Sequence, residues 1–402
     1  MPIPANVLAQ LNKLQKIALI IGVLASLLAV VGWFVDPARF FRSYLFAYMF
    51  WFGLTGGSLA MLMLHHMVGG GWGFIIRRLL EAATKLFPLV FVLFLPLLRG
   101  LHYLYPWAQP IPADDRVGQW QAIWSNPPFY IGRMILFFAI WIGFSYVLNK
   151  WSLQQDKSDD PKIYDRMTRW GGFGFLVFGI TMTFAVIDLV MSTNHHWYSS
   201  MYGVVFMAGQ ALSTLAFMLV MLAFLTKGGW PTDEVPTKFF RDLGNLTLAA
   251  TLFWAYVSFS QFLIIYTANI AEFATFYFFR IKGAWWWFVV AIMGLHFFLP
   301  FFVLLTGDNI KRSIPRLAKI ALFILAMRFV DLYWNIMPAW PEVRLNSTSP
   351  FHWLDFVLPL ALGGLWLAGF ATMVKKTESL LPIHDPRLEG NWPPLQEVAQ
   401  HG

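Results

Sequence analysis

Residues 202–226 read YGVVFMAGQALSTLAFMLVMLAFLT, an apolar run of 25 residues without Asp, Glu, Lys or Arg. An α-helix rises about 1.5 Å per residue, so about 20 apolar residues cross the roughly 30 Å hydrocarbon core of a bilayer. The run is about twice the length of a barrel strand and does not alternate between apolar and polar residues. It therefore predicts a membrane-spanning helix.

The same pattern recurs along the whole chain. Ten spans are predicted, over residues 17–35, 43–66, 83–105, 128–149, 170–191, 202–226, 243–268, 284–306, 317–337 and 353–374. The chain of 402 residues is 58% hydrophobic and only 12% charged, whereas soluble domains carry about 25% charged residues. This composition excludes a soluble enzyme, a disordered chain and a DNA-binding protein. We expect one all-α polytopic membrane domain over residues 1–402. Its C-terminal residues, 375–402, form a polar tail.

Lys and Arg residues are distributed unevenly between the two sides of these spans. Loops on the side of the N-terminal segment and the tail hold 20 of them, and the opposite side holds 7. Cytoplasmic loops of membrane proteins carry an excess of Lys and Arg. The count predicts that both termini lie in the cytoplasm and explains the net charge of +8.

Redox cofactors are not expected within this chain. It has no cysteine, which excludes thiolate-held iron–sulfur clusters and thioether-linked haem c. Haem b needs two histidines at matching depth on different helices. His65 and His66 are predicted near the inner face, His102 near the outer face and His296 near the middle of its span. We therefore predict neither haem nor iron–sulfur cluster, and no metal site.

Several ionisable residues fall inside or at the ends of the predicted spans, where each costs a few kcal/mol. Most lie towards the outer face: Arg99, His102, Arg133, Asp188, Glu272, Arg328, Asp331 and Asp355. In one interpretation they form an outer acid–base cluster, with His102 and Asp188 as quinol base or proton exit. Arg99, Arg133 and Arg328 would then hold the acids ionised or bind a headgroup oxygen. In the alternative they are structural ion pairs between helices.

Span 243–268 carries a polar stripe along one helical face. At 100° per residue, the following residues fall within about 80° of one another: Thr247, Thr251, Trp254, Ser258, Gln261, Asn269 and Glu272. The stripe extends over about 38 Å, enough to cross a membrane. His65 and His66 extend a shorter polar stripe of span 43–66 near the inner face. The stripes predict either a file of waters that conducts protons or interhelical hydrogen bonds.

These observations leave three classes of function open. One is a quinone-handling or proton-conducting subunit of an electron-transfer complex, another is a secondary transporter, and the third is a structural scaffold subunit. Transporters have spans broken by Gly or Pro at corresponding positions of two halves. Pro88, Pro96 and Pro300 interrupt two spans here, but not at corresponding positions. The transporter is therefore the less favoured interpretation.

Several stretches together resemble a known family. They are SYLFAYMFWFGLTGGSLAMLMLHHMVGGGWGFIIRRLLEA (43–82), RGLHYLYPWA (99–108), NPPFYIGRMILFFAIW (126–141), AVIDLVMSTNHHWYSSMYGVVFMAGQ (185–210), FSQFLIIYTANIAEF (259–273), RFVDLYWNIMPAW (328–340) and HDPRLEG (384–390). The chain resembles the NrfD/PsrC-like family of quinone-interacting membrane subunits, and within it the ActF-type subunits of bacterial alternative complex III, a quinol:electron-acceptor oxidoreductase.

The resemblance implies an architecture, a location and partners. It implies two four-helix bundles, at about 43–191 and 202–337, with peripheral helices at 17–35 and 353–374. It places the chain in the bacterial cytoplasmic membrane, in a complex that oxidises menaquinol or ubiquinol. The implied partners are a paralogous quinone-binding membrane subunit, an iron–sulfur protein and a multihaem cytochrome c.

Two positions depart from the family pattern. Relatives have a Pro and paired acids after the Asn that corresponds to Asn269, whereas this chain has one acid, Glu272. Relatives also have an acid–Pro pair where Asn194 and His195 stand. Both departures favour a supporting, proton-conducting role over quinol oxidation by this subunit itself.

Overall fold

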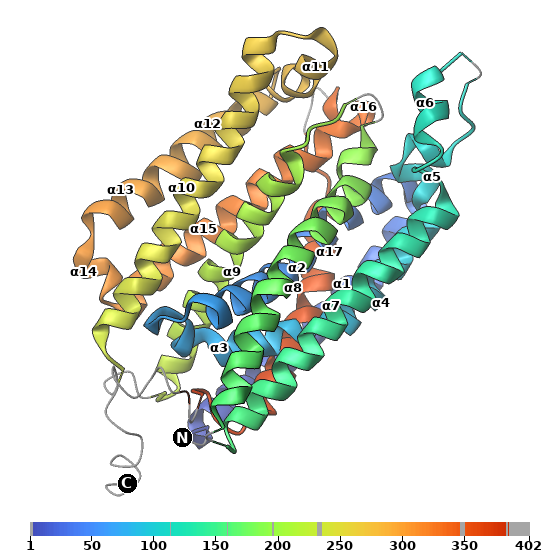
Figure 1. Cartoon of the computed structure of the whole chain (residues 1–402). Coiled ribbons are helices and arrows are strands. Elements are labelled where there is room, and N and C mark those ends of the chain that lie inside the picture. The colour runs from blue at the N-terminus through green and yellow to red at the C-terminus, as the bar shows by residue number, and fades with distance from the viewer. Residues whose placement is uncertain are drawn as a thin grey trace, which may run out of the picture.

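The computed structural model describes residues 3–112, 114–158, 160–194, 197–230, 235–345, 350–382 and 385. Throughout these residues the chain forms helices and connecting turns, with no strand (Figure 1). The long helices are α1 (Ala5–Val35), α2 (Pro37–Val68), α7 (Pro127–Gln155), α8 (Pro161–Leu189), α9 (Tyr202–Lys227), α10 (Thr237–Ala268), α15 (Ile314–Ile336) and α17 (Leu354–Lys375). Two further predicted spans are composite.

Shorter helices complete the chain. They are α3 (Gly71–Thr84), α4 (Phe87–Arg99), α5 (Leu101–Leu104), η1 (Pro106–Ala108), α6 (Arg116–Gln121), η2 (Met191–Thr193), α11 (Ala271–Arg280), α12 (Trp285–Ala291), the π-helix η3 (Ile292–Phe298), α13 (Leu299–Thr306), α14 (Asp308–Lys311), η4 (Met337–Ala339) and α16 (Pro341–Arg344). The predicted span at 83–105 covers the end of α3, α4 and α5, and the predicted span at 284–306 covers α12, η3 and α13.

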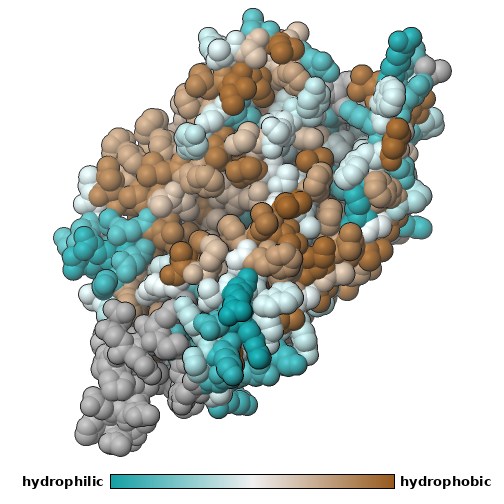
Figure 2. Space-filling model, viewed as in Figure 1, coloured by the Kyte–Doolittle hydropathy of each residue, from teal (hydrophilic) through white to brown (hydrophobic). Residues whose placement is uncertain are grey.

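Among the described residues, nine helical segments are long and apolar enough to cross a membrane, and the bent pair α3–α4 would be a tenth if it crosses as one span. This confirms the prediction of an all-α, multi-pass membrane protein. Apolar side chains cover the flanks of α10, α12 and α13, and hydrophilic residues gather towards the ends of the helices (Figure 2). Which end faces the cytoplasm stays a prediction.

We call the end of the molecule where α1 begins and α17 ends the proximal end, and the other the distal end. Helix α2 packs against α3, α4 and α8, and α9 packs against α10 and α15. Helix α2 also packs directly against α9, which joins the two groups into one array (Figure 1). The division into bundles at 43–191 and 202–337 stays a prediction, as does the role of the tail, most of which lies outside the described residues.

The two predicted peripheral helices, α1 and α17, pack closely against each other. Gly22 and Gly364 meet at this contact, where a Cβ added to Gly22 would lie 2.8 Å from the backbone nitrogen of Leu365. Small residues let membrane helices approach closely enough for dense van der Waals packing. Helix α17 also contacts α2, so it anchors α1 to the rest of the protein.

The predicted span at 83–105 is wrong in its beginning and its continuity. The helix starts at Gly71, breaks at Lys85 and Leu86, and α4 continues at an angle of 43° to α3. The count of Lys and Arg placed Arg77 and Arg78 in a cytoplasmic loop. They lie instead in α3 and are 0% and 2% exposed. They are buried because ion pairs with distant carboxylates stabilise them, as described below.

Candidate functional site

His296 lies in the middle of a membrane-length helix, inside the π-helical segment η3. It is fully buried, and its ring centroid lies 4.2 Å from that of Trp254 on α10. Neither ring nitrogen has a hydrogen-bond partner in the part of the chain that the structure describes. Because Pro300 has no N–H to donate to the carbonyl of His296, the α-helical hydrogen-bond pattern is interrupted here. π-helical turns are frequently found at functional sites.

Arg328 and Asp331 lie on α15, which packs against η3. They form an ion pair and are 3% and 4% exposed. Arg328 also donates to Ser213 Oγ at 3.4 Å, and its guanidinium carbon lies 5.7 Å from the Trp254 ring centroid. We call His296, Trp254, Arg328 and Asp331 the His296 cluster. It places a basic, an acidic and a titratable imidazole group together inside the array of spans.

A glycine makes room for this arginine. Gly209 of α9 faces Arg328, and a Cβ added there would overlap the guanidinium nitrogen Nη2. The close approach of α9 to α15 therefore depends on the absence of a side chain at this position.

Polar contacts extend from the His296 cluster to the distal end. Asn335 Nδ2 donates to Asp331 Oδ1 at 3.2 Å, and Arg280 of α11 donates to the Asn335 carbonyl at 2.8 Å. Arg280 also donates to the carbonyls of Trp334 and Phe276. Burial lowers the pKa of Arg280 to about 10. A continuous set of polar groups thus leads from α11 into the interior.

The polar stripe of α10 forms much of the buried face of that helix, but it ends before its predicted limit. Thr247 and Thr251 are buried, and each donates to the carbonyl four residues before it. Helix α10 ends at Ala268, and Asn269 follows it with a left-handed φ of 48°. Asn269 and Glu272 are exposed, and Glu272 belongs to α11. The prediction of one stripe through Glu272 is therefore wrong, because the helix turns before reaching it.

In the middle of the stripe, Gln261 has hydrogen-bond partners and Ser258 has none among the described residues. Ser258 Oγ is buried without a hydrogen-bond partner among the described residues. Gln261 accepts from Ser199 Oγ at 3.0 Å and donates to Tyr277 Oη at 3.1 Å. Burial raises the pKa of Tyr277 to about 12, so this phenol stays protonated. Gln261 therefore links α10 to α11 and to the segment before α9.

The predicted outer cluster does not assemble into one site. Arg133 of α7 pairs with Asp188 of α8, with Nε–Oδ2 and Nη2–Oδ1 distances of 2.9 Å each. Arg328 pairs with Asp331 separately. Arg99 and His102 are exposed at the distal end. The predicted cluster is therefore divided among three buried ion pairs, Arg133–Asp188, Arg328–Asp331 and Arg39–Asp355. Arg99, His102 and Glu272 are exposed instead.

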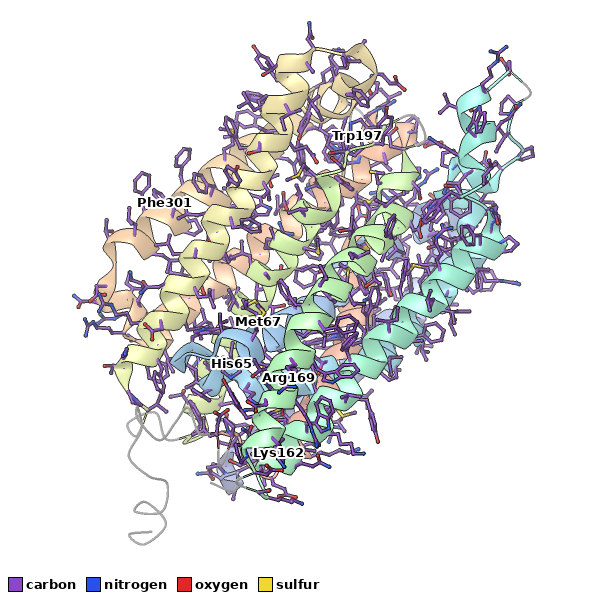
Figure 3. The ribbon with its side chains drawn as sticks, viewed as in Figure 1. His65, Met67, Lys162, Arg169, Trp197 and Phe301 are labelled. Atoms are coloured by element: carbon purple, nitrogen blue, oxygen red, sulfur yellow. The ribbon has the colours of Figure 1, made fainter. Side chains whose placement is uncertain are left out.

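His65 and His66, predicted as a cytoplasmic entry for protons, are buried at the proximal end. Trp72 and Phe74 pack on the His65 ring, with centroids 5.5 and 5.1 Å away. Figure 3 shows His65 near the turn from α2 to α3, far from Trp197 at the opposite end. Gly73 of α3 faces the His65 ring and Gly171 of α8 faces His66, so both histidines are enclosed by neighbouring helices.

The sequence analysis did not predict a buried ionic network that lies at the proximal end. Arg77 binds Glu81 and Asp385, with an Nη1–Oδ2 distance of 2.9 Å to the latter, and Arg78 binds Glu81 and Asp156. Ser152 of α7 donates to Glu81. The network fastens α3 to α7 and to the C-terminal segment. Glu81 lies one helical turn from both arginines, but Ser152, Asp156 and Asp385 lie far away in the sequence, so spacing alone does not reveal the network.

A second missed network lies at the distal end. Arg39 of α2 forms a buried ion pair with Asp355 of α17, which also accepts from Ser43 and from Tyr333 Oη at 2.8 Å. Arg39 lies in the first turn of α2, and Asp355 lies in the first turn of α17. The sequence analysis placed Arg39 in a loop and Asp355 at the end of a span. The network joins α2, α15 and α17.

Within the described residues, no group of three or more His, Cys, Asp or Glu side chains could hold a metal ion. His195 and His196 lie outside the described residues. The ring packed on His296 is that of Trp254, which supplies no metal ligand.

No family model matches this chain, and no curated protein matches it either. The function proposed below is therefore supported by the sequence resemblance described above and by the arrangement of the residues.

Proposed function

We propose that this chain is a membrane subunit of a quinol-oxidising electron-transfer complex, in which it supports quinol oxidation and provides part of a proton path. The observation that carries the proposal is the His296 cluster: an imidazole without a hydrogen-bond partner, buried beside an ion pair inside membrane-length helices. Ionisable groups at such depth are costly and typically mark ion or proton pathways.

The chemistry of each residue supports a role in proton transfer. The two ring nitrogens of histidine can accept a proton on one side and donate one on the other, so His296 is the group proposed to relay it. Arg328 and Asp331 balance each other, which keeps the net charge beside His296 low. Asn335 and Arg280 extend the polar groups to the distal end, where quinol oxidation would release two protons.

Electrons follow a different route. This chain has no cysteine, so its own residues cannot hold an iron–sulfur cluster by thiolates. In the proposed complex, the paralogous membrane subunit oxidises menaquinol or ubiquinol. The electrons then pass to the iron–sulfur protein and the multihaem cytochrome c. The complex lies in the bacterial cytoplasmic membrane.

The test measures protons moved per electron in vesicles that contain the complete complex. His296→Gln should lower this ratio while the complex assembles and quinol oxidation continues. His352→Gln is the matched control, because that histidine lies outside the His296 cluster, just before α17 at the distal end. An unchanged ratio in His296→Gln would contradict the proton path and favour a scaffold, in which substitutions act only through assembly.

Asp188 and Glu272, which the sequence predicts to lie on the proton path, give a weaker test. Asp188→Asn combined with Glu272→Gln is expected to lower proton translocation if both belong to the path. Asp188 also completes a buried ion pair with Arg133, so its loss lowers stability as well. The His296 variant separates these two effects better.

A secondary transporter is the second candidate, and two broken spans favour it. Helices α3 and α4 meet at 43°, and η3 interrupts the span from α12 to α13. Discontinuous spans form the binding sites of many transporters. A transporter would purify as an independent protein. Co-purification with an iron–sulfur protein and a multihaem cytochrome would exclude it.

A further inference from the structure

A groove of about 780 Å³ opens at the proximal end, where the α3–α4 break meets the end of α7 and the start of α8. Its lining residues are Lys85, Tyr146, Asn149, Lys150, Leu153, Gln154, Lys157, Ser158 and Ile163. The volume lies in the range of about 300–1,000 Å³ that small-molecule sites occupy. Lys85 comes from the α3–α4 break, and the other lining residues come from α7, α8 and the turn between them.

The groove surface is mainly apolar, with lysines among the residues that line it. Three lysines line it, and Lys85 and Lys150 form no ion pair with a carboxylate of the described residues. Lys157 is 3.5 Å from Glu378, and both side chains of that pair are largely exposed. The nearby acid Asp156 is engaged by Arg78. An anionic ligand would therefore meet uncompensated positive charge here.

Apolar surface continues from the groove along α7. Leu153, Tyr146, Ala139 and Ile135 are exposed and follow one another at seven, seven and four residues, which places them on one face of the helix. From Lys150 to Ile135 the helix rises about 22 Å, more than half of the roughly 30 Å hydrocarbon core. The face is long enough for an acyl chain of one leaflet.

We propose that this groove binds one anionic phospholipid. The phosphate of its headgroup contacts Lys85 and Lys150, and its acyl chains lie along the exposed face of α7. Basic pockets between membrane helices are typical sites for acidic phospholipid headgroups. A soluble anion would use the lysines but not the apolar face. The inference does not depend on the proposed function, because a scaffold or transporter would bind the same lipid.

The experiment compares two lipids that share their acyl chains. The full-length protein in detergent is mixed with dioleoyl phosphatidylglycerol or dioleoyl phosphatidylcholine, and native mass spectrometry counts the lipids bound per chain. We expect one tightly held phosphatidylglycerol, retained at least fivefold better than phosphatidylcholine. A 100-fold excess of inorganic phosphate should not displace it, because phosphate lacks acyl chains.

Substitutions locate the site. Lys85→Gln with Lys150→Gln should reduce phosphatidylglycerol retention to that of phosphatidylcholine, and Lys85→Arg with Lys150→Arg should preserve it. Lys16→Gln with Lys319→Gln is the matched control, because it removes two exposed positive charges from the proximal end outside the groove. If the double Gln variant does not fold, Lys150→Gln alone, at an exposed position, should lower retention at least twofold.

Three results would overturn the proposal. Equal retention of the two lipids would show that the headgroup charge is not recognised. Equal loss in the control and the groove variants would show that only overall charge matters. Displacement by inorganic phosphate would show a soluble-anion site instead of a lipid site.

Discussion

Arg133 and Asp188 form a bidentate ion pair between α7 and α8, with both nitrogen–oxygen distances at 2.9 Å. The guanidinium also donates to the Trp124 carbonyl and lies 4.1 Å from the Trp124 ring centroid. The Trp124 indole in turn donates to Asp188 at 3.2 Å. The pair and the indole therefore connect two spans to the segment before α7.

Asp188→Asn should destabilise the protein by about 3–5 kcal/mol, because it leaves the buried charge of Arg133 without a counter-charge. The measurement is unfolding of the purified chain in mixed micelles, followed by tryptophan fluorescence. Arg133→Leu combined with Asp188→Leu should recover most of the loss, since neither charge is then buried alone. Equal stability of Asp188→Asn and the original protein would show that the pair contributes little.

Gly209→Ala should displace Arg328, because the new Cβ would overlap its guanidinium. We expect a loss of about 1–3 kcal/mol, as for other overpacked interiors. Gly132→Ala on α7 is the matched control, since no atom lies within 4 Å of a Cβ added there. In a helix that control should be neutral or stabilising by about 0.5–1 kcal/mol. The same loss in both variants would contradict a specific role of Gly209.

The spans were predictable from sequence because apolar runs of membrane length leave little other choice. Helix α9 begins at Tyr202 as expected. The buried helix α3, which contains Arg77, was not predictable from apolar runs, because a charged segment between spans normally indicates a loop. Its burial depends on Asp156 and Asp385, and nothing local indicates that those carboxylates meet it.

The candidate site was predictable in part. Buried acids and bases within spans marked Arg328 and Asp331, which do lie together. The sequence analysis treats His296 only as a haem ligand. One local feature does indicate an irregular helix there, because His296 lies four residues before Pro300. The exposure of His102 could not be deduced, because it depends on where the helix breaks.

Asp385→Asn should lower the free energy of unfolding by about 1–3 kcal/mol, because it weakens a fully buried charged hydrogen bond to Arg77. Glu378→Gln is the control from the same C-terminal segment. Its ion pair with Lys157 is 68–73% exposed, so it should change stability by less than about 1 kcal/mol. The two variants are compared by unfolding in mixed micelles. A larger effect of Glu378→Gln would contradict the buried network.

His352 should make stability depend on pH at the distal end. Partial burial and the nearby charge of Arg39 lower the pKa of His352, and its Nδ1 accepts from the Leu354 amide at 3.4 Å. Asp355 and Asp36 act in the opposite direction but do not reverse the shift. Because the unfolded chain has the ordinary pKa of about 6.5, it binds more protons than the folded chain between that value and the lower folded pKa.

The contribution of His352 is therefore fully present above about pH 6.5 and is lost as the pH falls through the lowered folded pKa. The measurement is the melting temperature in detergent between pH 7.5 and pH 5. His352→Asn keeps an acceptor for the Leu354 amide and cannot titrate, so its melting temperature should fall less over this range than that of the original protein. Parallel pH profiles for the two proteins would show that the imidazole is not coupled to folding.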